Sequence, residues 1–468
     1  MKHCSLLIFI ALVLAAAGCI EDGFTAAPAD APVPAVDSVR LGTVFTDEPT
    51  PTRRFTLRNH ASKSVSVTSI TLGGDHPEYF RLNVDGFSGR EFHDVEIRGK
   101  DSIYIFVEAT LPPNGRDVPV DISATIDILA CGVSRSVVVD AQGRDAERLC
   151  ATRITADTRF TPGKPYIVYD SLVVAPGATL SLDAGTELYF HDGAYLAVRG
   201  TLMTYGTPGQ PVHMTGDRTG YVVADISFDI MSRQWTGVFF TSTSRDNVLT
   251  GLDMRNTWQG LYVEGPETSL TLVNCRLHNS AGLVLESVHA RTEAVGCEFA
   301  EGGEGLVRLQ GGTATLNHCT LANYYLFSAI SGPALQLAHL SADMDDDTSG
   351  LPYLQATVAN SIIYGLGSDL SHGDLKDTAV TLDHCLLKSP GKDDDNFLSC
   401  IWDTDPLFRN NREKYVFDYR LAAESPAIGA GAPSLTDPRT STDAHGTPRA
   451  IPPSLGAYEY LPDPQPEK

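Results

Sequence analysis

Short apolar strands recur at a nearly constant interval between about residue 165 and residue 400. Val174 and Leu196 lie 22 residues apart, and Leu180 and Leu202 are separated by the same interval. Each strand is too short to form a stable sheet by itself, so its apolar side chains can be buried only if successive coils stack. A repeat of this length predicts a solenoid, which we interpret as a parallel β-helix over residues 148–400.

A series of cysteines follows the same interval. Cys275, Cys297 and Cys319 stand 22 residues apart in turn, and each begins a triplet whose third residue is apolar. The series continues at Ser361 and Cys385, after steps of 42 and 24 residues. We therefore expect that one coil between Cys319 and Ser361 carries an altered or extended turn.

The position of the cysteines in the repeat bears on their chemistry. Residues at one inward position of adjacent coils lie about 4.8 Å apart, with parallel side chains. This geometry favours a stack of small, buried thiols at Cys275, Cys297 and Cys319 over a disulfide or a metal site. His318 directly precedes Cys319, so its side chain should point the opposite way, outward from the core.

Residues 38–147 have a different pattern, in which apolar and polar residues largely alternate. The expected strands recur about every ten residues, at 55–59, 65–72, 79–84, 103–107, 122–129 and 136–139. Alternation with this spacing predicts an antiparallel β-sandwich. We therefore expect an all-β chain, with an N-terminal β-sandwich, a right-handed parallel β-helix and a C-terminal cap. The cap would be formed by a closing segment and tail over residues 401–468.

The first residues predict export. An apolar stretch from Leu6 to Ala17 is too short to span a bilayer and is typical of a signal peptide over residues 1–18. It ends in Ala-Ala-Ala-Gly-Cys at Cys19, which resembles the lipobox of bacterial lipoproteins. The resemblance implies that Cys19 is lipidated and that the membrane is a partner through this lipid. An ordinary secretory signal is the alternative. Residues 19–37 are rich in alanine and proline and suit a flexible tether.

Several motifs resemble one family of exported solenoids. Pro176-Gly-Ala-Thr-Leu, Gly200-Thr-Leu, Trp235-Thr-Gly-Val and Asp405-Pro-Leu-Phe look like parts of the right-handed β-helix lipoproteins of Bacteroidota, which have a pectate-lyase-like solenoid. The strands of residues 38–147 resemble the immunoglobulin-like modules of bacterial surface proteins. The acidic residues after the cysteine of the lipobox resemble the surface-export signal of this group. These resemblances imply an outer-membrane lipoprotein that faces the cell surface rather than the periplasm.

In an exported protein, nine cysteines raise the question of disulfides. Two pairs lie close enough in the sequence for local bridges, Cys131 with Cys150 and Cys385 with Cys400. The sequence alone fixes neither pairing, and free thiols are the alternative.

The charge of the chain limits its partners. The 468 residues include 58 acidic and 35 basic side chains, which gives a formal charge of −23. This charge would repel nucleic acid, so we expect no nucleic-acid partner. It also disfavours polyanionic, pectin-like substrates unless Ca²⁺ or a local basic patch offsets it.

An enzyme of this fold would need catalytic carboxylates. Polygalacturonase-like hydrolases resemble one another in four motifs that supply them, and three of the four are missing, so the catalytic residues are unknown. Asp343, Asp345 and Asp347 alternate and offer oxygen ligands for Ca²⁺, although they do not fit a twelve-residue calcium loop. We expect no cofactor other than this Ca²⁺ ion.

Four aromatic residues are candidates to face a ligand. Stacking on sugar rings along a coil face is one use for them, and packing in the core or at an end of the solenoid is the other. They are Trp235, Trp258, Tyr324 and Tyr325.

These observations favour a non-enzymatic outer-membrane lipoprotein whose β-helix presents a surface to a glycan or to an envelope protein. A polysaccharide lyase or glycoside hydrolase of the pectate-lyase-like fold is the first alternative, and a structural subunit of an envelope complex is the second. A groove lined with converging carboxylates would favour the enzyme, whereas a flat or aromatic-lined face would favour binding. The fold alone does not decide, because it hosts both binding and catalysis.

Overall fold

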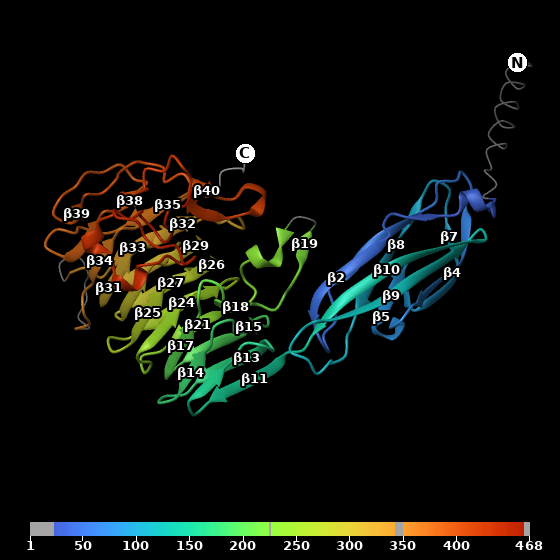
Figure 1. The fold of residues 1–468 in the computed structure, drawn as a ribbon, viewed down its shortest axis with the longest axis horizontal. Helices are drawn as coiled ribbons and strands as arrows, with labels where there is room; N and C mark the ends of the chain where they lie inside the picture. Colours follow the sequence, from blue (N-terminus) through green and yellow to red (C-terminus); the bar gives the residue numbers. More distant parts are fainter. Residues whose placement is uncertain (1–22, 224–225, 342–349, 463–468) are drawn as a thin grey trace, which may run out of the picture. The chain divides into compact units, whose positions relative to one another are not determined.

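A computed structural model describes residues 23–223, 226–341 and 350–462 (Figure 1). The chain divides into two compact units, the first ending at Asp145 and the second beginning at Ala146. The described residues form strands and short 3-10 turns, with no α-helix among them. The all-β class that the sequence predicts is therefore confirmed.

The first unit consists of two five-stranded sheets around one core, an arrangement compatible with a β-sandwich. One sheet has the order β1 (Val33–Pro34), β3 (Arg53–Arg58), β8 (Ser102–Ala109), β5 (Phe80–Val84) and β6 (Phe87–Gly89). The other has the order β2 (Ser38–Phe45), β10 (Val133–Arg144), β9 (Val120–Ala130), β4 (Val65–Gly73) and β7 (Glu91–Ile97). Alternation along β8 buries Ile105 and Val107 in the core and leaves Phe106 on the outer face.

In the second unit, short parallel strands stack in three rows, as expected for a β-helix or a related solenoid (Figure 1). The first two rows start from the strands β11 (Glu147–Ile154) and β13 (Tyr166–Val174) and form a 17-stranded sheet. Row 1 continues through β15 (Glu187–Phe190), β18 (Val212–Gly216), β23 (Leu252–Met254), β26 (Arg276–Ser280), β29 (Glu298–Gly302), β32 (Thr320–Asn323), β35 (Ile362–Gly365) and β38 (Leu386–Leu387).

Row 2 faces a different side of the same coils. It contains β16 (Tyr195–Val198), β21 (Gly237–Phe240), β24 (Leu261–Glu264), β27 (Leu285–Val288), β30 (Val307–Gln310), β33 (Leu335–Ala338) and β36 (Leu370–Ser371). Row 3 is a separate ten-stranded sheet. Its strands are β12 (Thr158–Phe160), β14 (Thr179–Leu182), β17 (Thr201–Tyr205), β22 (Asn247–Thr250), β25 (Ser269–Val273), β28 (Arg291–Val295), β31 (Thr313–Asn317), β34 (Gln355–Ala359), β37 (Ala379–Asp383) and β39 (Phe397–Leu398).

The strand register agrees with the predicted repeat at one position and corrects it at another. Leu180 pairs with Leu202, as the interval of 22 residues predicts. Leu196, however, pairs with Leu172 and not with Val174, so the coil is longer at this position than the interval suggests. The length of a coil varies because its turns vary, whereas the strands must stay aligned to keep their hydrogen bonds.

The cysteine series lies in the core of the second unit. Cys275, Cys297, Cys319 and Cys385 are fully buried and free. The backbone N–H of Cys275 donates to Cys297 Sγ at 3.5 Å, and that of Cys319 donates to Ser361 Oγ at 3.0 Å. Burial raises the pKa of the Cys297 thiol. These groups therefore stack as small core side chains, as the repeat predicts for an inward position.

The residue before each position of this series adopts the left-handed conformation. Asn274, Gly296, His318, Asn360 and His384 have φ values between 49° and 66°. Glycine and asparagine tolerate this conformation best. The backbone therefore turns in the same way at the same place in successive coils.

The C-terminal segment crosses these left-handed positions in reverse order. Residues 432–442, which we call the strap, run from a late coil back to an earlier one. Three sets of contacts fix this direction: Asn360 with Ala432 at 2.8 and 3.1 Å, His318 Nε2 with Thr436 Oγ1 at 3.1 Å, and Asn274 Nδ2 with the Thr442 carbonyl at 3.4 Å. The sequence predicts a closing cap, but this part of the segment lies along the side of the coils.

Asn360→Ala should destabilise the second unit by about 3 kcal/mol. The buried side chain accepts a hydrogen bond from the Ala432 N–H, donates to the Ala432 carbonyl and contacts His318 Nε2 at 3.2 Å. Each bond contributes on the order of 1 kcal/mol, and the loss leaves strap groups unpaired. Urea unfolding would measure the change. Asp246→Ala is the control, because this exposed residue also has a positive φ, of 54°, and lies far from the strap in sequence. Equal losses in the two variants would contradict a stabilising role for the strap.

Candidate functional site

Outward side chains at the beginning of row 1 line a cavity of about 510 Å³, which we call the groove. Alternation along β15 directs Leu188 and Phe190 into the core, so Glu187 and Tyr189 project outward into the groove. The same alternation on β18 and in the chain around β23 supplies further polar groups. The polar and aromatic lining includes Glu187, Tyr189, His213, Thr215, Arg218, Asp229, Asp253 and Arg255.

The strand register aligns these residues across coils. Glu187 pairs with His213, and His213 pairs with Asp253. The same outward position then passes through Arg276, Glu298, Thr320, Ile362 and Leu386. This position is therefore polar in the early coils, which form the groove, and becomes apolar in the late coils.

An inserted segment forms one side of the groove. It lies between β18 and β21 and contains β19 (Tyr221–Val223), β20 (Ile226–Ser227) and the 3-10 turn η3 (Phe228–Ile230). The buried Asn256 side chain donates to the carbonyls of Phe228, Asp229 and Met231 at 3.1, 2.8 and 2.8 Å. These bonds hold the insertion against the coil, so Asp229 has a defined place at the groove.

Two arginines fix the charge of one groove carboxylate. Asp253 is almost fully buried and forms ion pairs with Arg255 at 2.8 Å and with Arg276 at 2.6 Å. Burial raises the pKa of its carboxyl group, but the two guanidinium groups outweigh burial and hold the pKa well below its usual value. Asp253 thus stays ionised, and it orients Arg255 rather than supplying a proton.

Glu187 and Tyr189 lie on the same face of β15 and both line the groove. The Tyr189 hydroxyl donates to Glu187 Oε2 at 2.8 Å. This bond links an aromatic ring to a carboxylate on one strand, and Thr215 and His213 lie on the adjacent strand. The groove thus combines donors, acceptors and a ring on a rigid sheet, which is the composition of a site for a polar ligand.

Beyond the groove, the C-terminal segment covers row 1 (Figure 1). β40 (Phe408–Asn410) and β41 (Asp418–Leu421) pair antiparallel, and the Tyr419 ring stacks on Tyr324 at 5.9 Å. Ala300 and Ala322 of row 1 pack in the same cluster. The outward face of the later coils is therefore covered here and forms a second core.

Ionisable groups are buried beneath this segment. His278 Nδ1 lies 3.4 Å from Glu298 Oε1 and 3.6 Å from Glu301 Oε2. The Tyr419 hydroxyl donates to Glu301. Burial raises the pKa of Glu298 to about 7 and that of Glu301 well above its usual value, and it lowers the pKa of His278 to about 3. The cluster therefore favours neutral side chains.

Three of the four candidate aromatic residues do not face a ligand. Trp235 stacks on Phe190 in the core at 4.0 Å, Tyr324 packs under the C-terminal segment, and the Tyr325 hydroxyl bonds Ser232 at 2.6 Å. These three are buried, because the apolar face of each coil and the covering segment need large side chains to fill their volume. Trp258 is 55% exposed, and the Arg233 guanidinium lies 4.8 Å from its ring.

The other predicted sites are separate from the groove. Cys131, Cys150, Cys385 and Cys400 are free thiols in this structure, and Cys131 and Cys150 belong to different units. Cys19 and the three aspartates proposed for Ca²⁺, Asp343, Asp345 and Asp347, lie outside the described residues. Within the described ranges, no group of three or more His, Cys, Asp or Glu side chains is arranged to hold a metal ion.

Comparisons with known proteins do not place the chain in a family. No protein-family model matches it, and no curated protein matches it. Among solved structures, the chain is similar to a family 123 glycoside hydrolase from Clostridium perfringens, with a TM-score of 0.18 and 7% sequence identity. That match covers 25% of this chain and 26% of the hydrolase, and a TM-score this low does not show a shared fold. In the described part of the chain, no helix is long and apolar enough to cross a membrane.

Glu298→Gln should change how stability depends on pH. The pKa of Glu298 is about 7 in the folded protein and near its ordinary 4.5 when unfolded, so the folded state loses stability as pH rises between these values. The neutral amide does not titrate. Relative to the parent protein, the variant should therefore gain about 3 kcal/mol between pH 4.5 and pH 8. Urea unfolding at both pH values would measure the gain.

The matched control is Glu304→Gln, which changes an exposed glutamate of the next turn. Its stability relative to the parent should stay the same at the two pH values. If Glu298→Gln behaved like this control, the carboxyl would not be buried in neutral form.

Proposed function

We propose that this protein is an exported, lipid-anchored right-handed β-helix protein that binds a glycan in the groove without cleaving it. The observation that carries the proposal is the groove itself, where polar side chains from three successive coils converge on a cavity of about 510 Å³. A cavity of this size accommodates a ligand of several rings.

The spacing of the coils suits an extended sugar chain. Adjacent coils present equivalent side chains about 4.8 Å apart, which is close to the repeat of an extended hexose chain. Glu187, His213 and Asp253 occupy one such series. Each coil can therefore offer a hydrogen-bonding group to a successive sugar, and the backbone ladder keeps these groups at fixed separations.

The distribution of protonated carboxyl groups favours binding over hydrolysis. Hydrolysis of a glycosidic bond uses one carboxylic acid as the proton donor and a second carboxylate as base or nucleophile. Burial raises the pKa of Glu298 and Glu301, but both lie under the C-terminal segment. Asp253 belongs to the groove and is committed to its two arginines.

A glycoside hydrolase or polysaccharide lyase is the second candidate. It is supported by Glu187, Asp229 and His213, which line the same cavity and could act as acid and base on a bound sugar. The two functions differ in whether bond cleavage accompanies binding.

The cellular setting is part of the proposal. The lipobox-like sequence at Cys19 supports an N-terminal lipid, and the acidic residues that follow it support display at the surface of the outer membrane. The first unit, compatible with an immunoglobulin-like β-sandwich, would then lie between the anchor and the solenoid along the chain. An envelope protein in place of a glycan is a further partner that suits the same setting.

Replacing two outward groove residues should weaken glycan binding in the groove without unfolding the protein. The double variant Glu187→Gln with His213→Ala removes a carboxylate and an imidazole at paired positions, and neither side chain belongs to the core. Isothermal titration with a panel of neutral and acidic oligosaccharides should show at least a tenfold loss of affinity for a glycan that the parent binds in the groove. Glu286→Gln, on an outward position of row 2, should bind as the parent does.

The same panel separates the two candidate functions. Incubation with the parent protein should release no new reducing ends and no unsaturated products. Release that depends on Glu187 or His213 would replace the binding proposal with the hydrolase or lyase.

The anchor is tested independently of the groove. Metabolic labelling with a fatty-acid analogue should mark the parent protein, and a Cys19→Ala variant should lose the label and leave the membrane fraction. Cys4→Ala removes another cysteine near the start of the chain and should be labelled normally. Undiminished labelling of Cys19→Ala would refute this residue as the lipid attachment site.

A further inference from the structure

The first unit has a cavity of its own, of about 810 Å³, on the outer face of one sheet. It lies over β8, β5 and β6, on the side of these strands that faces away from the core. The polar and aromatic lining residues used below are Phe106, Glu108, Arg81, Asn83, Arg90 and Glu78.

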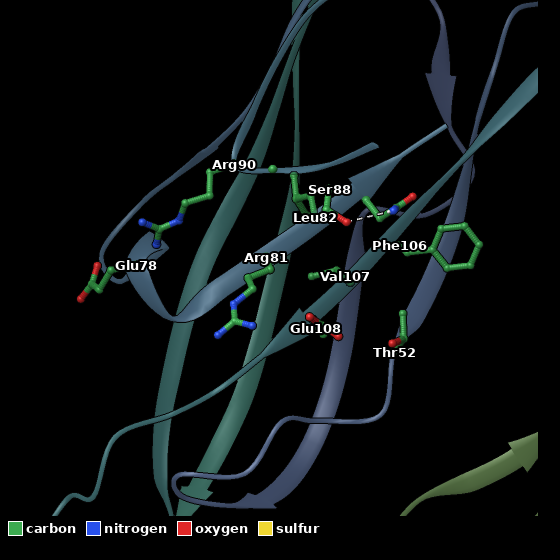
Figure 2. Close-up of a pocket in the computed structure, with 11 residues that line it drawn as sticks. Thr52, Glu78, Arg81, Leu82, Ser88, Arg90, Phe106, Val107 and Glu108 are labelled. Carbon is green, nitrogen blue, oxygen red and sulfur yellow. Dashed lines mark hydrogen bonds between the residues drawn. The ribbon is translucent and has the colours of Figure 1, made fainter. Parts of the chain in front are cut away.

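The strand register arranges the lining in two adjacent lines across the sheet. Phe106 pairs with Asn83, and Asn83 pairs with Ser88, which gives one line with an aromatic ring, an amide and a hydroxyl. Glu108 pairs with Arg81 in the next line. Figure 2 shows Arg81 and Glu108 projecting into the middle of the cavity, with Phe106 at one side and Arg90 and Glu78 at the other.

Some of these groups are held in place, and others are available to a ligand. Asn83 Nδ2 donates to Ser88 Oγ at 3.1 Å, and the Arg90 guanidinium donates to the Pro77 carbonyl at 2.5 Å (Figure 2 shows the first bond). The side chains of Arg81 and Glu108 form no hydrogen bond or ion pair with another residue of the described ranges. A guanidinium and a carboxylate thus stand side by side, and both can accept a partner.

The charges of the cavity select the kind of partner. Arg81 and Arg90 are balanced by Glu78 and Glu108, so the lining is close to neutral. An anionic ligand would meet the two carboxylates and a cationic ligand would meet the two guanidinium groups, and each would be disfavoured. An uncharged ligand that both donates and accepts hydrogen bonds has no such penalty.

Phe106 supplies the apolar part of the site. Its ring is half-buried beside the uncommitted polar groups, and its centroid lies 6.1 Å from that of Tyr104 on the same strand. The Arg54 guanidinium covers Tyr104, 4.8 Å from the ring centre, so Phe106 is the aromatic surface that borders the cavity. A flat ring beside planar, bidentate polar groups matches a sugar, which has an apolar C–H face and a rim of hydroxyl groups.

We propose that this cavity is a second carbohydrate site, which binds an uncharged glycan through stacking on Phe106 and hydrogen bonds from vicinal hydroxyl groups to Arg81 and Glu108. The site is distinct from the groove of the second unit, and its occupation does not depend on the groove. A chain with both sites would contact glycan through each of its two units.

The test uses the full exported chain and three sets of hexasaccharides. Uncharged β-1,3-glucan, β-1,4-mannan and β-1,4-xylan oligomers form the first set, oligogalacturonate is the anionic probe, and oligomeric glucosamine is the cationic probe. In the background of the groove variant Glu187→Gln with His213→Ala, isothermal titration should detect an uncharged probe, and Phe106→Ala and Arg81→Ala should each weaken its binding at least tenfold. Arg81 is exposed, so its variant keeps the test valid if Phe106→Ala lowers stability.

Two control variants assign the binding to this cavity. Phe87→Ala removes a ring that is 74% exposed on β6 but does not line the cavity, and it should bind as the parent does. The groove variant Glu187→Gln with His213→Ala should also keep this binding. In the groove-variant background, exclusive binding of a charged probe, uncharged-probe binding that survives both cavity variants, or no binding of any uncharged probe would overturn the proposal.

Discussion

The second unit depends on the stacking of coils that cannot bury their apolar side chains alone. Each coil must keep its backbone hydrogen bonds to the coils on either side. The side chain at each inward position must also be small or apolar enough to pack. Leu180 over Leu202 and the buried cysteine series show how strictly this holds. Outward positions are not bound by the same requirement. The fixed core therefore places the outward side chains of successive coils at regular intervals.

The outward face of row 1 uses this freedom in two ways. In the early coils it holds Glu187, His213 and Asp253, and a groove stays open above them. In the late coils it holds Thr320, Ile362 and Leu386, and the C-terminal segment packs on them. The ionisable groups between these regions are covered as well, and they are accommodated by shifting toward neutral forms, as the pKa of about 7 for Glu298 indicates. Covering part of the sheet thus limits the groove to the coils that remain open.

The repeat in the sequence reveals the all-β class, the stacked coils and the inward cysteines, because core positions return at similar intervals. It does not reveal the groove. Glu187, His213 and Asp253 are separated by 26 and 40 residues, since an insertion lengthens one coil, so their alignment appears only in the strand register. The sequence does not reveal the strap either, for another reason. Alternation places His318 outward, but only the folded chain shows that the strap covers it and buries the side chain.

The two cavities lie on different sheets but are built in the same way. In each, β-strand alternation separates a buried apolar core from an outward polar face, and part of that face is immobilised by its own hydrogen bonds. Asp253 forms ion pairs with two arginines and keeps Arg255 in place, whereas Arg81 and Glu108 are left without partners among the described residues. Groups that are already positioned lose little conformational entropy when a ligand binds. Selectivity then follows from the spacing of these groups and from the balance of their charges, both of which the sheet register sets before any ligand arrives.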